Sequence, residues 1–95
     1  MGARGNVVKE LRELEARLVE RLKLTDEQRE RAYEALTEKQ LDLLSFARAD
    51  MSQEEMAQRL GIHQSNVSRM LNRIVRDLPK WLTISGLQPS KDYKS

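Results

Sequence analysis

The chain has 95 residues, enough for one domain, and 34% of them are charged, against a usual share of about 25%. It has no cysteine and a single histidine, His63, which excludes disulfides, thiol catalysis, thiolate zinc sites and any motif that needs two histidines. No apolar run approaches the ~20 residues of a membrane span, and Arg4, Lys9 and Arg12 interrupt the N-terminus before a signal peptide can form. We therefore expect a cytoplasmic protein without a membrane partner, a metal or another cofactor.

Charge is distributed unevenly along the chain. The net charge is +2, but residues 1–58 hold 10 basic and 13 acidic side chains, whereas residues 59–95 hold 7 basic and 2 acidic ones. A basic C-terminal part on a nearly neutral protein favours a surface that binds polyanions. A solvated face that binds nothing has the same composition, so charge alone does not decide between the two interpretations.

The first predicted helix runs from about Asn6 to Lys23. Its apolar residues recur at spacings of three and four and form one stripe: Val7, Leu11, Leu14, Leu18 and Leu22. We treat residues 1–24 as an N-terminal amphipathic helix with two alternative roles. It folds back as an ordinary core helix, or it pairs with its copy in a second subunit. We favour a homodimer, with this helix as the dimer seam.

Capping signals predict where the next three helices begin. A Ser or Thr followed three residues later by Glu or Gln satisfies two unpaired backbone N–H groups at a helix start. Three such pairs begin the second, third and fourth helices: Thr25 with Gln28, Thr37 with Gln40, and Ser52 with Glu55. Gly61 stands where a left-handed residue would end the fourth helix.

The fifth predicted helix runs from Gln64 to about Leu78. Its apolar residues draw one inward face: Val67, Met70, Leu71, Ile74, Val75 and Leu78. Pro79 is expected to close this helix or to open a last short one, and residues 85–95 read as a loose tail. The fold class is therefore all-α, with about five helices, a central domain over residues 25–84 and no β-wing.

Residues 52–70 have the pattern of a helix-turn-helix. Ala57 is small where two helices would cross closely, and Gly61 gives the turn a permissive backbone. Ile62 and Val67 are apolar at the spacing that locks the second helix onto the first. This pattern predicts two short helices at a steep angle, with the second one presented outward.

The same segment resembles a known family. Leu36-Thr37, Ser52-x-x-Glu55 and Ala57-x-x-Leu60-Gly61-Ile62 follow the order of sigma-factor region 4 and of LuxR-type regulator domains, over roughly residues 36–75. Two departures are Asp50-Met51, where the family has a glycine near the turn, and His63, where it has a serine. The resemblance implies a regulator of transcription that binds double-stranded DNA, and RNA polymerase becomes a candidate partner.

The recognition helix of such a domain lies in the major groove with its N-terminal residues against base edges. Six side chains on the polar face of the fifth helix are candidates for base contacts: Gln64, Ser65, Asn66, Ser68, Arg69 and Asn72. Gln and Asn suit adenine, and Arg69 suits guanine. The candidates for phosphate contacts are Ser52, Gln53, Arg73, Arg76 and Lys80, with Arg48 and Arg59 as weaker ones.

The sequence predicts a sequence-specific DNA-binding protein that reads the major groove with residues 64–78 and is not an enzyme. Two other interpretations share the helical pattern. One is a protein-interaction adaptor that keeps the architecture without DNA contact. The other is the DNA-binding subunit of a phage or plasmid recombination, packaging or partition system.

Overall fold

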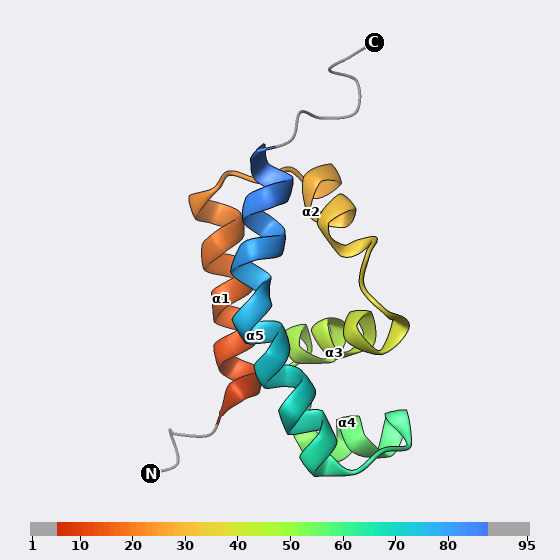
Figure 1. The fold of residues 1–95 in the computed structure, drawn as a ribbon. Helices are drawn as coiled ribbons and strands as arrows, with labels where there is room; N and C mark the ends of the chain where they lie inside the picture. The colour runs from red at the N-terminus through yellow and green to blue at the C-terminus, as the bar shows by residue number, and fades with distance from the viewer. Residues whose placement is uncertain (1–5, 88–95) are drawn as a thin grey trace.

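The computed structural model describes residues 6–87. Within this range the chain forms α1 (Val7–Arg21), α2 (Asp26–Tyr33), α3 (Glu38–Arg48), α4 (Gln53–Leu60) and α5 (Gln64–Leu87), and no strand (Figure 1). The expected all-α class is confirmed.

Helix α5 organises the molecule, because it contacts each of the other four helices. Helix α1 lies alongside it, α2 packs near its C-terminal end, and α3 and α4 lie near its N-terminal end (Figure 1). The large side chains that are fully buried come from four helices: Leu11, Leu43, Leu44, Met56, Val67, Leu71, Ile74, Leu78 and Leu82. Burying these side chains is the main favourable contribution to folding.

The apolar stripe of α1 faces the core of its own chain. Val7 and Leu11 are buried, and Leu14, Leu18 and Leu22 pack against the same cluster. Of the two roles considered for α1, this contact is that of a core helix. The stripe therefore packs against its own chain, with Leu14, Leu18 and Leu22 only partly buried.

The two predicted T-x-x-Q capping boxes are both formed. The Thr25 hydroxyl accepts from the Gln28 N–H at 3.0 Å, and the Gln28 side chain accepts from the Thr25 N–H at 2.9 Å. Thr37 and Gln40 repeat the arrangement at 3.2 and 2.9 Å. These local hydrogen bonds place the starts of α2 and α3 where the sequence predicts them.

The expectation that the fifth helix ends at Leu78 is wrong, because α5 continues through Pro79 to Leu87. Leu82 is fully buried, and the buried Ser85 hydroxyl donates to the Gln28 carbonyl. A Cβ added at Gly86 would stand 3.1 Å from the Leu24 side chain, so Gly86 lies close to the segment that precedes α2. Packing therefore keeps residues 79–87 helical; the rest of the expected tail, residues 88–95, lies outside the described residues.

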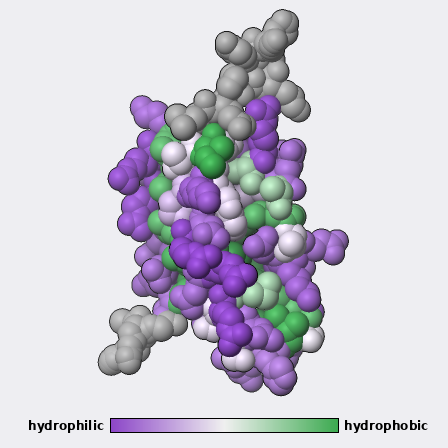
Figure 2. Space-filling view, in the orientation of Figure 1, coloured by the Kyte–Doolittle hydropathy of each residue, from purple (hydrophilic) through white to green (hydrophobic). Residues whose placement is uncertain are grey.

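The face shown in Figure 2 is mostly hydrophilic, with smaller apolar areas between the hydrophilic ones. Among residues 6–87, no helix combines the length and apolar character needed to cross a membrane. The same residues contain no cluster of three or more histidine or carboxylate side chains placed to hold a metal ion.

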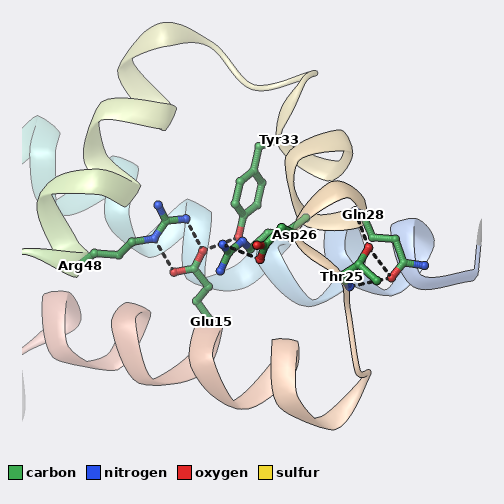
Figure 3. Close-up of polar contacts among 7 residues, drawn as sticks. Glu15, Thr25, Asp26, Gln28, Tyr33 and Arg48 are labelled. Carbon is green, nitrogen blue, oxygen red and sulfur yellow. Dashed lines mark hydrogen bonds and ion pairs between the residues drawn. The ribbon is translucent and has the colours of Figure 1, made fainter. Parts of the chain in front are cut away.

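One polar cluster lies inside the fold and joins α1, α2 and α3 (Figure 3). The buried Glu15 carboxylate accepts from Tyr33 Oη at 2.6 Å and from Arg48 Nη2 and Nε at 2.6 and 3.0 Å. Burial raises the pKa of Glu15, but the hydrogen bonds from Arg48 and Tyr33 outweigh it and hold the pKa below its ordinary value. Burial, together with the Glu15 carboxylate, raises the pKa of Tyr33. The charged Glu15 side chain therefore links three helices through its hydrogen bonds.

Candidate nucleic-acid interface

Helices α4 and α5 and the turn between them form the predicted helix-turn-helix. Gly61 closes α4 with φ +68°, a left-handed conformation that glycine adopts without strain. The Ile62 N–H donates to the Ala57 carbonyl at 3.1 Å, which ties the turn back to α4. Ala57 and Val67 are both buried where the two helices meet. The turn therefore sets the angle at which α5 leaves α4.

The entry into α4 differs in two details from the expected pattern. Ser52 Oγ accepts from the Glu55 N–H at 3.1 Å, but the Glu55 carboxylate pairs with Arg59 at 3.1 Å. Asp50 has φ +59°, so it occupies the left-handed conformation for which a glycine would be favoured. Aspartate tolerates that region better than most residues, which explains how the turn forms without glycine.

The inward row of α5 determines which of its side chains face outward. Val67, Leu71, Ile74 and Leu78 are fully buried, so residues on the opposite side of the same turns are left in solvent. Five of the six candidates for base contacts are exposed, namely Gln64, Ser65, Asn66, Arg69 and Asn72, whereas Ser68 is half-buried. Figure 2 shows the corresponding band of hydrophilic side chains over the course that α5 follows in Figure 1.

Two of these side chains differ in how ready they are for a ligand. Arg69 forms no hydrogen bond or ion pair with any residue in the range 6–87, so its guanidinium is available. The Asn72 amide nitrogen donates to the Ser68 carbonyl at 2.8 Å. A bidentate contact of Asn72 with adenine would therefore require the side chain to turn away from its own helix.

The candidates for phosphate contacts lie at two places. Ser52 and Gln53, at the start of α4, line one shallow depression together with Gln64 at the start of α5. Arg73, Arg76 and Lys80 are exposed further along α5. In sequence, Ser52 and Gln53 precede the base-contact candidates, and these three cations follow them.

Among residues 6–87, Arg76 is the one member of this set with an ion pair. Its Nε lies 3.1 Å from the Asp77 carboxylate, and the hydrogen bond from Arg76 lowers the pKa of Asp77. The Arg76 side chain is exposed and that of Asp77 is partly so. A pair that solvent reaches contributes little to stability, so a phosphate can replace the carboxylate.

Arg48 and Arg59, the two weaker candidates, are engaged elsewhere. Arg48 holds Glu15 through two hydrogen bonds, and Arg59 pairs with Glu55 on the surface of α4. A cation that sequence reasoning missed is Lys39, which lines a depression with Asn66, Arg69 and Arg73. Lys39 is far from α5 in the sequence, so no pattern of residue spacing could have predicted that it lies beside this helix.

Comparison with known families supports the same segment. Residues 41–77 match the IclR helix-turn-helix domain, a match that spans most of α3, all of α4 and the N-terminal half of α5. It covers less than half of the chain and supports neither sigma-factor region 4 nor the LuxR type in particular. No curated protein and no solved structure matches the chain significantly. Residues 41–77 thus carry a helix-turn-helix domain of the DNA-binding kind.

Proposed function

We propose that this protein binds double-stranded DNA at specific sequences, with the N-terminal half of α5 in the major groove, and that it regulates transcription in the cytoplasm. The observation that carries the proposal is the polar face of residues 64–76, which points into solvent while the opposite row is fully buried. An α-helix fits the major groove with just such a face toward the bases. The proposal assigns the protein no catalytic role.

The roles of individual side chains follow from their chemistry. Arg69 would pair bidentately with guanine, and Gln64 and Asn66 with adenine, while Ser65, Ser68 and Asn72 would supply further base contacts. Ser52, Gln53, Arg73, Arg76 and Lys80 would hold phosphates and set the orientation of the domain on the duplex.

We further propose that two copies bind together on a site with two-fold symmetry, because one helix-turn-helix makes few base contacts and a dimer doubles them. The α1 stripe packs inside its own chain, so the contact between copies would use another surface or form on DNA. RNA polymerase is the partner that a regulator bound at a promoter would encounter. Sedimentation of the protein alone and with duplex measures the stoichiometry directly.

The decisive experiment is selection of bound sequences from a random duplex pool, followed by titration of the selected duplex at about 50 and about 200 mM salt. Three cations on phosphates predict a roughly 40-fold loss of affinity over that range for each protomer. Selection of one motif, with its half-site spacing, would establish specificity. An adaptor would instead show little affinity at either salt concentration, and salt-dependent binding without any enriched motif would contradict specific reading.

A further inference from the structure

A depression of about 230 Å³ lies where α3, α5 and the turn after α4 meet. Its lining comprises Lys39, Ile62, Asn66, Arg69, Met70 and Arg73. The depression adjoins the candidate base contacts, because Asn66 and Arg69 belong to both.

The chemistry of this depression differs from that of the rest of the polar face. Ile62 and Met70 are partly buried and pack against the core, so they form an apolar floor. Lys39, Arg69 and Arg73 surround it, all exposed, and none has an ion pair or side-chain hydrogen bond among residues 6–87. No carboxylate lines the depression. Such a site suits a ligand that is anionic yet presents a small apolar group.

Duplex DNA presents that combination in its major groove. Thymine carries a 5-methyl group there, and apolar side chains are the groups that recognise it. The phosphates on both sides of the groove supply the negative charge. A recognition helix approaches the edges of the bases. The apolar floor lies beside Asn66 and Arg69, so it would contact a methyl group on a base edge that these residues approach.

Building on the proposed function, we infer that this depression receives the 5-methyl group of one thymine in each half-site. The Ile62 and Met70 side chains contact the methyl, and Lys39 and Arg73 hold neighbouring phosphates. Arg69 at the rim remains available for an adjacent guanine. Recognition of each half-site then requires a thymine, and α3 adds a phosphate contact to the base contacts made by α5.

The test uses the duplex obtained by selection, with each thymine replaced singly by uracil. Uracil keeps every hydrogen-bonding group and lacks only the methyl. One position per half-site should lose about fourfold in affinity, the factor that corresponds to a single methyl group left in water. A duplex that still binds, but in which no uracil replacement changes the affinity, overturns this inference and leaves the proposed function intact. A protein that binds no duplex at all overturns both.

Two variants assign the effect to this depression. Met70→Gln, close in length but polar, should bind the thymine and uracil duplexes equally; a full thymine preference in that variant places the methyl elsewhere and overturns the inference. Lys39→Gln should weaken binding to both duplexes alike and lower the salt slope by about one, while keeping the thymine preference. An unchanged slope would remove Lys39 from the interface.

Discussion

At the scale of single residues, Glu15 shows how a charge can be stabilised inside a small helical fold. Its side chain is 7% exposed, whereas that of its partner Arg48 is 45% exposed. Two hydrogen bonds from the guanidinium and one from Tyr33 compensate for the loss of water around the carboxylate. The cluster joins three helices, so its contribution is to the fold and not to the proposed DNA-binding surface.

Glu15→Gln should lower the free energy of unfolding by about 2 kcal/mol near neutral pH. This lies between the values for buried and exposed pairs, because solvent reaches Arg48. Since the folded-state pKa of Glu15 lies below its ordinary value of 4.5, the ionic contribution is complete above that pH and is lost as the pH falls through the folded pKa. Urea denaturation at about pH 7 and about pH 3 should show the gap between variant and wild type closing in acid.

Tyr33→Phe is the matched control, since it removes one hydrogen bond and leaves the ion pair. Its effect should be about 1 kcal/mol and should change less with pH. A Glu15→Gln penalty of the same size at both pH values would show that the charge of Glu15 contributes nothing to stability.

Two arginines on the same helix should behave differently in DNA binding. Arg69→Ala should reduce affinity for the selected duplex by about 1–3 kcal/mol and relax the preference at one base pair, because it removes a base contact. Arg76→Ala should weaken binding to all duplexes similarly and lower the salt slope by about one, because it removes a phosphate contact. Titration against single-base variants of the duplex separates the two patterns, and an unchanged preference in Arg69→Ala would refute its assignment to guanine.

At the scale of elements, α5 is the helix whose length the local signals do not predict. Pro79 lacks the N–H that would bond to the Val75 carbonyl, and it disfavours the helical conformation of Leu78 before it. Leu78 and Leu82, one on each side of Pro79, are nevertheless fully buried, and α5 packs against both α1 and α2. Burial of these side chains outweighs the local preference of one proline.

Pro79→Ala should therefore stabilise the protein by about 1–2 kcal/mol. Alanine restores a backbone hydrogen bond and removes most of the ~3 kcal/mol disadvantage of an interior proline, while the more flexible unfolded chain offsets part of the gain. Thermal denaturation followed by circular dichroism measures the change. A loss of stability would mean that proline at this position is needed for α5 to pack on α1 and α2.

At the scale of the whole molecule, α1 and the helix-turn-helix form one packed unit. The family match begins at Leu41, yet α1 packs along α5 and contributes Leu11 to the same core as Leu71 and Ile74. The part of α5 that carries the candidate base contacts is continuous with the part that α1 and α2 hold. The orientation of the recognition surface therefore depends on residues outside the matched segment.

Leu11→Ala should lower the free energy of unfolding by about 2–5 kcal/mol, since its side chain is fully buried. In the wild type and in Leu11→Ala, helix content and the fluorescence of Trp81, the only tryptophan, should change together in a single unfolding transition. An alternative result is loss of α1 in a separate early transition with Trp81 unaffected. That result would show that α1 is an independent appendage.

Local signals were sufficient for most of the fold. The hydroxyls of Thr25, Thr37 and Ser52 start three helices, and Gly61 ends the fourth, because a cap or a left-handed residue acts within one helical turn. The exposure of Gln64, Ser65, Asn66 and Arg69 also agrees with the helical period of the sequence. The sequence did not predict the pairing of Arg59 with Glu55 or the hydrogen bond from Asn72 to the Ser68 carbonyl. Each depends on a choice between side-chain rotamers, which residue spacing does not resolve.

What the amino-acid sequence alone determined was the all-α class, the helix starts and the outward polar face of residues 64–76, because these depend on interactions between residues a few positions apart. Only the tertiary structure decided that α1 packs on its own chain, that α5 passes through Pro79, and that Lys39 stands beside Arg69. Those outcomes depend on side chains brought together from distant parts of the chain, where the apolar area buried outweighs local preference and where no sequence spacing records which surfaces meet.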